Sequence, residues 1–188
     1  METFERKIFT GERALFGARD LTLTDCIFED GESPLKESAG LTLRGCSFRW
    51  KYPLWYGHDI SLRDCVLTDA ARAGIWYTEN ISLTDTVIEA PKTFRRARGI
   101  NLTNVTMTNA AETLWACRDI TLQNVSAKGD YLLMNAEDVT ADHLLLNGNY
   151  AFDGAKNVIL RSSKLFTKDA FWNSEDVTVY DSYITGEY

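Results

Sequence analysis

The stretch Ile60-Ser61-Leu62-Arg63-Asp64-Cys65-Val66-Leu67, followed by Gly74-Ile75-Trp76, contains the pattern that decides the fold of this chain. It consists of an apolar-x-apolar strand, a two-residue corner, a second short strand, a turn, and a third strand that ends in an aromatic side chain. Another copy begins at Ile100-Asn101-Leu102 and ends at Thr113-Leu114-Trp115. A unit that recurs in this way indicates a repeat architecture.

The first apolar residue of the unit, which we call the anchor, recurs along almost the whole chain at steps of 19 to 21 residues. The anchors are Leu21, Leu41, Ile60, Ile81, Ile100, Ile120, Val139, Val158 and Val177. A second apolar residue lies two positions later in every copy, and this spacing on a strand puts both side chains on one face. Four residues after most anchors comes Gly, Asn or Asp, which tolerate the left-handed backbone of a tight corner.

Coils with three short strands, two tight corners and one longer turn describe a parallel β-helix. Each coil would hydrogen-bond to the next at roughly 4.8 Å, and the stacked coils would share one core. We therefore predict an all-β, right-handed single-stranded parallel β-helix of about nine coils, because the strict hexapeptide period of the left-handed form is absent. A leucine-rich repeat is the alternative fold, but no copy fits its L-x-x-L-x-L-x-x-N pattern well.

The repeat fills the chain, so we predict a single domain over residues 1–188. Residues 1–20 precede the first anchor, and the stretch from Phe4 to Phe16 is expected to cap the bare core edge. Residues 21–188 form the coils. The chain stops in the middle of a coil without a recognisable cap, which predicts either a fragment or an end covered by another molecule, with end-to-end self-association.

Charge and hydropathy favour a cytoplasmic protein that binds neither nucleic acid nor membranes. The net charge is −7, whereas general nucleic-acid binding needs a basic balance. No apolar run approaches the ~18 residues of a membrane helix. The charged N-terminal residues 1–7 lack the apolar core of a signal peptide.

Three of the four cysteines occupy one inward position in successive coils, namely Cys26, Cys46 and Cys65. We interpret them as a stacked ladder of small buried side chains. A disulfide between neighbouring coils is the alternative, but it would leave one thiol over. Cys117 belongs to another sheet. Reduced thiols suit a cytoplasm, and without a CxxC motif or a His/Cys cluster we predict no metal site and no cofactor.

The outward face of the third strand is rich in Trp, Tyr and Arg, the residue types that dominate binding hot spots. An aromatic face of this kind is unfavourable to leave in water. Its candidate ligand-binding residues are Trp55, Tyr56, Trp76, Tyr77, Arg95, Arg96, Trp115 and Trp172.

Three interpretations of this face are open. In the first, it binds a glycan or another elongated anionic ligand, with rings stacked on sugar faces and Arg95 and Arg96 meeting acidic groups. In the second, another subunit covers it, including a second copy of this chain. In the third, the variable turns of the same chain cover it. We expect a protein that binds or processes a carbohydrate; a non-catalytic interaction scaffold or self-assembling scaffold is the alternative.

Whether the chain is an enzyme is left open by the sequence, and the catalytic candidates are Asp153, Glu112 and Arg95. A glycosidase needs two carboxyls separated by either ~5 or ~6.5–9.5 Å. Asp153 is the one carboxylate in the ladder that contains the tryptophans, so a partner would come from a turn, for example Glu112. Arg95 could serve as the base of a polysaccharide lyase, but the outward Asp cluster that would hold its calcium is missing.

Arg95 falls between Trp76 and Trp115 in the predicted ladder. The roughly 4.8 Å between coils allows a cation–π contact on each side. Arg95 then either bridges two rings for stability or is held by them to receive an anion.

Several third-strand segments resemble the bacterial family called domain of unknown function 3737. They include Tyr52-Pro53-Leu54-Trp55-Tyr56, Ala73-Gly74-Ile75-Trp76-Tyr77 and Lys168-Asp169-Ala170-Phe171-Trp172. The resemblance covers essentially the whole chain. It implies a right-handed single-stranded β-helix of the pectin-lyase type, and it implies no activity because the family is uncharacterised.

Overall fold

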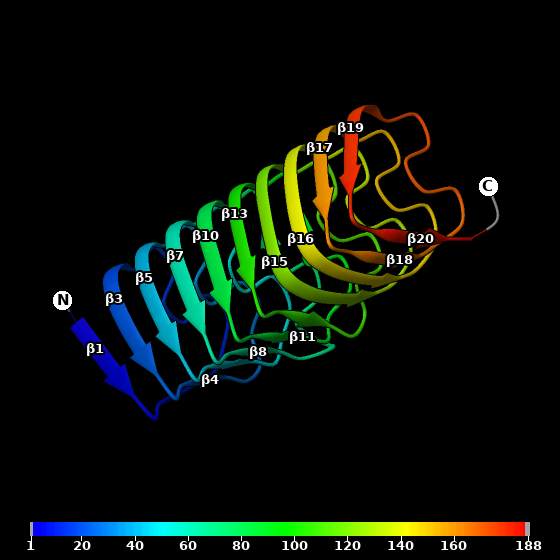
Figure 1. The fold of residues 1–188 in the computed structure, drawn as a ribbon. Coiled ribbons are helices and arrows are strands. Elements are labelled where there is room, and N and C mark those ends of the chain that lie inside the picture. Colours follow the sequence, from blue (N-terminus) through cyan, green and yellow to red (C-terminus); the bar gives the residue numbers. More distant parts are fainter. Residues whose placement is uncertain (1, 187–188) are drawn as a thin grey trace.

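The computed structural model describes residues 2–186, and the regular secondary structure in this range consists of strands alone (Figure 1). Residue 1 and residues 187–188, the last two of the end for which no cap was expected, lie outside the described range. Since residues 2–186 form no helix, none of them belongs to a helical membrane span.

The first face of the rod is a parallel sheet of strands, most of which begin two residues before an anchor. The strands are β1 (Glu2–Glu5), β3 (Arg19–Thr24), β5 (Ala39–Arg44), β7 (His58–Arg63), β10 (Glu79–Thr84), β13 (Arg98–Thr103), β15 (Arg118–Lys128), β16 (Glu137–Asn147), β17 (Lys156–Arg161) and β19 (Glu175–Tyr180). They lie side by side along the rod (Figure 1). Anchors pair with anchors, as in Ile60↔Ile81 and Ile81↔Ile100.

Shorter strands follow the first corner and form the second face. They are β2 (Ile8–Phe9), β4 (Ile27–Phe28), β6 (Ser47–Phe48), β8 (Val66–Leu67), β11 (Val87–Ile88), β14 (Thr106–Met107), β18 (Lys164–Phe166) and β20 (Tyr183–Thr185). In two coils the strands on both sides of the corner join into one: β15 and β16 are 11 residues long and continue from the first face into the second, with left-handed Asn124 and His143 at the corner.

The third face is less regular than predicted. Its only regular strands in residues 2–186 are β9 (Ile75–Trp76) and β12 (Phe94–Arg95), extended by an isolated bridge from Arg95 to Trp115. Flanking residues adopt left-handed backbone, with φ of 52° at Ala73 and 58° at Tyr77, so the extended stretch between them is short. Backbone hydrogen bonds still join the coils here, for example from Leu54 N to Gly74 O at 2.8 Å.

The interior confirms the predicted right-handed parallel β-helix. The anchors from Leu21 to Val158 are buried, as are the inward residues of the third face from Leu35 to Phe152. Rings at equivalent positions stack inside the rod: Phe28 lies 5.1 Å from Phe9 and 4.8 Å from Phe48. Because no coil buries its apolar side alone, this stacking is the source of the core.

The N-terminal residues, which were expected to cap the core edge, form a further coil stacked on β3 and β4, which gives about ten coils instead of nine. Strand β1 pairs with β3, and β2 pairs with β4. Phe4 and Phe9 lie opposite Leu23 and Phe28, so they take the places of inward residues. The coil is hard to see in the sequence because Glu2 stands where the other coils have an apolar anchor.

The cysteines confirm the predicted ladder of buried thiols, and all four are free. Each ladder thiol donates to the carbonyl two residues earlier, as Cys46 Sγ does to Arg44 O at 3.4 Å and Cys65 Sγ to Arg63 O at 3.2 Å. In the next coil Thr86 Oγ1 donates to Thr84 O at 2.9 Å. In these four coils a small inward side chain therefore donates a hydrogen bond to the backbone at the first corner.

Candidate functional site

The centre of the third face is a stack of planar groups that we call the aromatic–arginine ladder, formed by Trp55, Trp76, Arg95 and Trp115. The rings of Trp55 and Trp76 are nearly parallel, with centroids 5.2 Å apart and an angle of 6° between them. The guanidinium carbon of Arg95 lies 4.6 Å from the ring centroids of both Trp76 and Trp115. The predicted double cation–π contact of Arg95 is confirmed.

The register of the coils explains this stack. Trp76 and Arg95 are partners in the β9–β12 pair, and Arg95 bridges to Trp115. Side chains at equivalent positions of parallel strands lie roughly 4.8 Å apart, which is close to the centroid separation of stacked rings. As a result, Trp55 covers one face of Trp76 and Arg95 covers the other. A sugar therefore has no free face of Trp76 on which to stack.

The turns of the same chain take up the indole N–H groups. Trp55 Nε1 donates to Ala73 O, and Trp76 Nε1 donates to Lys92 O at 2.8 Å. Both carbonyls belong to the turn of the following coil. The rings are half-buried, so this part of the face is partly covered by its own turns, as one of the three interpretations expected.

A second row lies beside the ladder and contains Tyr56, Tyr77 and Arg96. The two tyrosine rings are stacked at 4.8 Å with an angle of 9° between them. Lys36 Nζ lies 5.6 Å from the centroid of Tyr56. Arg96 is exposed, and its guanidinium forms no ion pair within residues 2–186. This row is the more accessible part of the face.

Glu112 neutralises part of the positive charge of the ladder. Its Oε2 lies 3.2 Å from Arg95 Nη2 and 3.2 Å from Lys92 Nζ. Arg95 Nε is buried and has no hydrogen-bond partner among the described residues. The guanidinium is thus covered on both faces and paired at one edge, which suits a residue that holds the coils together.

The candidate catalytic carboxylates Glu112 and Asp153 each contact other side chains. Glu112 forms ion pairs with Lys92 and Arg95, and Asp153 accepts a hydrogen bond from Asn173 Nδ2 at 3.3 Å. The two residues belong to coils two steps apart, about 10 Å along the rod. The described residues also contain no cluster of His, Cys, Asp and Glu that could hold a metal ion.

Trp172 lies apart from the other tryptophans. Met134 and Asp153 occupy the two intervening ladder positions, and the Trp172 side chain is 58% exposed. The sequence pattern put it in the same row but could not show that the stack stops at Trp115.

A hollow of about 290 Å³, which we call the aromatic groove, opens between the ladder and the turns. It is lined by Tyr52, Trp55, Arg72, Ala73, Trp76, Pro91 and Lys92. The Tyr52 ring lies 4.7 Å from that of Trp55. Arg72 is exposed and forms no ion pair within residues 2–186. The sequence predicted that variable turns could cover this face, but Tyr52 and Arg72 were not among the predicted site residues. Their position three to four residues before a ladder tryptophan was the available signal.

Fold and site together define a parallel β-solenoid with an aromatic, arginine-containing face. The model of the family described as "Protein of unknown function (DUF3737)" matches residues 2–188. The chain therefore belongs to this family, as the resemblance of its third-strand segments indicated.

Solved structures give distant fold similarity only. Full-length QnrB1, a plasmid-mediated fluoroquinolone resistance protein, is 13% identical with a TM-score of 0.48, and the alignment covers 98% of this chain and 94% of that one. PfbA, a surface adhesin of Streptococcus pneumoniae, is 9% identical with a TM-score of 0.49, over 96% of this chain and 62% of that one. No curated protein matches the sequence.

Proposed function

We propose that the protein is a non-catalytic binding protein for an acidic carbohydrate, with the aromatic groove as its site. The observation that carries the proposal is the juxtaposition of apolar walls from Tyr52, Trp55 and Trp76 with two cations, Arg72 and Lys92, at the rim. The two cations lie at this rim although the protein as a whole carries a net charge of −7. Few polar groups placed around an apolar hollow are typical of small-ligand sites.

The geometry favours a particular binding mode. Since the faces of Trp76 are covered, a sugar would contact ring edges and the outer side of the Tyr52–Trp55 pair. A carboxylate on that sugar would meet Arg72, whose planar guanidinium can donate hydrogen bonds to both carboxylate oxygens. Arg72 has no competing acid within residues 2–186, whereas Lys92 shares Glu112 with Arg95. Arg72 is therefore the main anion contact of the proposed site.

Two observations support the non-catalytic part of the proposal. Glu112 and Asp153 lie on coils two steps apart, and both already contact other side chains.

We also propose that the protein acts in the cytoplasm, because its four thiols are free and buried. A reducing compartment keeps such thiols unpaired.

The test is calorimetric titration with oligogalacturonate and with a neutral oligosaccharide of the same length. We expect binding of the acidic probe alone, weakened about tenfold by Arg72→Gln, because a charge-assisted pair contributes about 1.5–3 kcal/mol. Lys164→Gln makes the same charge change on an exposed residue of β18 and is expected to have no effect. Equal weakening by both variants, or no binding of the acidic probe, would contradict the proposal.

A docking surface for a protein, including a second copy of the chain, is the second candidate function. Phe166, Trp172 and Tyr183 are all more than 40% exposed, and large apolar side chains of this kind mark interaction surfaces. Sedimentation velocity over a hundredfold range of concentration tests self-association. A dimer that dissociates on the Trp172→Ala substitution would favour this candidate. A monomer at every concentration would exclude self-association.

A further inference from the structure

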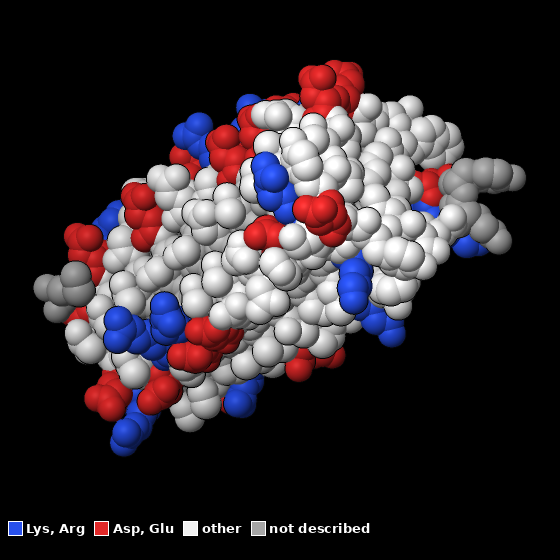
Figure 2. Space-filling model, viewed as in Figure 1, with Lys and Arg blue, Asp and Glu red and all other residues white. Residues whose placement is uncertain are grey.

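The residues that begin the first-face strands form a row of charges along one edge of the rod. This strand-start row runs Arg19, Ala39, His58, Glu79, Arg98, Arg118, Glu137, Lys156 and Glu175, each paired in register with the next. Acidic and basic side chains are interspersed along this upper edge of the rod (Figure 2). From Glu79 onward the charge changes sign at every step except one.

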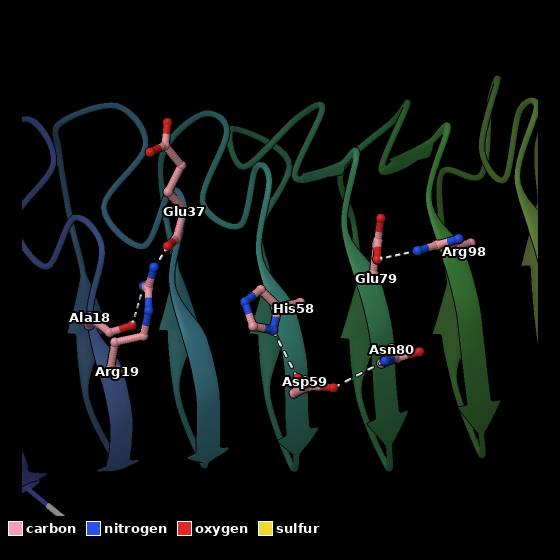
Figure 3. A network of polar contacts seen from close by, with 8 residues as sticks. All are labelled: Ala18, Arg19, Glu37, His58, Asp59, Glu79, Asn80 and Arg98. Carbon is pink, nitrogen blue, oxygen red and sulfur yellow. Dashed lines mark hydrogen bonds and ion pairs between the residues drawn. The ribbon is translucent and has the colours of Figure 1, made fainter.

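The exception is the step from Arg98 to Arg118, where two guanidinium side chains start neighbouring strands about 4.8 Å apart. Like charges directly opposite each other in a sheet are destabilising. Each arginine is paired with an acid on its far side: Arg98 Nη2 lies 2.7 Å from Glu79 Oε2, and Arg118 Nη2 lies 3.2 Å from Glu137 Oε2. Figure 3 shows Glu79 and Arg98 reaching toward each other from β10 and β13.

A hollow of about 370 Å³ lies at this step, which we call the arginine hollow. It is lined by Glu79, Arg96, Ala97, Arg98, Ala116 and Arg118. Arg96 has no acidic partner in the described residues, and Ala97 and Ala116 leave the floor open because their side chains are short. The size falls at the lower end of the ~300–1,000 Å³ of small-ligand sites.

We propose that the arginine hollow binds a phosphate group between Arg98 and Arg118, with Arg96 as a third contact. A tetrahedral oxyanion with two negative charges can accept hydrogen bonds from two guanidinium groups at once, which matches the planar donor geometry of arginine. It would also convert the one repulsive step of the strand-start row into an attractive one. This site is separate from the aromatic groove and does not depend on the proposed carbohydrate.

The acids around the hollow predict opposite changes in phosphate affinity when an acid or an arginine is neutralised. Glu79 lines the hollow, and Glu137, which is not part of its lining, forms an ion pair with Arg118. Both acids therefore compete with a bound anion for the arginines. Glu79→Gln should therefore strengthen phosphate binding severalfold, whereas Arg118→Gln should weaken it at least tenfold. Glu175→Gln and Lys156→Gln are matched controls, because the two residues form an equivalent ion pair at 3.2 Å in the same row without an adjacent like charge.

The experiment is titration of the full chain with inorganic phosphate in chloride buffer of constant ionic strength, followed by NMR chemical shifts and by the rise in Tm. We expect one saturable site, with opposite responses in Glu79→Gln and Arg118→Gln and none in the controls. A second titration with a hexose phosphate separates the sources: tighter binding of the ester shows a group carried by a larger ligand, and equal binding shows a site for the free ion. No saturable shift, or the same change in the variants and in the controls, would overturn the site.

Discussion

The guanidinium carbon of Arg95 lies 4.6 Å from the ring centroid of Trp76, the same distance at which it lies from Trp115 on the following coil. This contact joins neighbouring coils on the face that has the least regular hydrogen bonding. A planar cation is needed for it, since only a flat group fits between two rings at the spacing of the coils. The relationship therefore gives Arg95 a structural role that does not require a ligand.

Arg95→Lys should lower stability by about 1–2 kcal/mol, because lysine keeps the charge but loses the planar stacking on two rings. Urea unfolding followed by tryptophan fluorescence measures the change. Arg96→Lys is the control, since the adjacent Arg96 is exposed and has no ring partner among the described residues. An unchanged unfolding midpoint together with lost binding of oligogalacturonate would instead make Arg95 a ligand contact.

Phe94→Ala should destabilise the protein by about 3–5 kcal/mol, because the Phe94 ring is fully buried and its removal leaves a cavity between stacked coils. Trp172→Ala removes a larger but mainly exposed ring and should change stability by less than about 1 kcal/mol. Thermal unfolding of the two variants side by side measures the difference. Equal losses would mean that the third face does not point its phenylalanines inward.

Gly148→Ala should be among the most damaging small substitutions in the chain. A Cβ at Gly148 would overlap the carbonyl oxygen of Gly129 in the preceding coil, and backbone atoms cannot move aside without separating the coils. We expect a loss of about 3 kcal/mol, the upper end of the usual cost of overpacking. Gly17→Ala, which meets no atom within 4 Å but has φ of 67°, should cost only about 1 kcal/mol. Similar Tm values for the two variants would contradict the close approach of the coils.

The thiol of Cys117 should make stability fall at alkaline pH. Burial raises the pKa of Cys117 from its ordinary value of 9.0 to about 12. Above pH 9 the unfolded chain releases this proton while the folded chain keeps it, so stability is complete below pH 9 and declines toward pH 12, by at most ~1.4 kcal/mol per pH unit. Cys117→Ser lacks this contribution, and serine at the equivalent Ser174 already donates to Phe152 O at 2.6 Å. Parallel pH profiles of urea unfolding for the two proteins would show that the thiol does not titrate in this way.

The first two faces could be predicted because their signal is local and periodic. Anchors such as Ile60 and Ile81 repeat at nearly constant steps, and a spacing of two residues on a strand fixes which side chains point inward. The N-terminal coil could not be predicted from the anchors, because Glu2 breaks the apolar pattern while Phe4 and Phe9 preserve it.

The candidate site could be predicted only in part, because its geometry depends on contacts between coils. The order Trp76, Arg95, Trp115 was visible in the sequence, and the cation–π stack follows from register. The sequence does not show that Trp55 and Trp76 cover each other's faces, since that depends on side-chain rotamers set by Ala73 O and Lys92 O in the following turns. The like-charge step between Arg98 and Arg118 also required the register of the strands.

The length of β15 and β16, which reach from the first face into the second, has a consequence for the dynamics of the rod. These strands pair on both sides of the corner, from Arg118↔Glu137 to Gln123↔Asp142 and from Val125↔Leu144 to Lys128↔Asn147, and only the corner residues Asn124 and His143 are left out of the register. Elsewhere the corner separates two shorter strands, as between β10 and β11. Amide protons within β15 and β16 should therefore exchange with solvent more slowly than those of the coils in which two shorter strands flank the corner. The aromatic groove lies outside these two strands, so we expect its coils to open locally more often than β15 and β16 do.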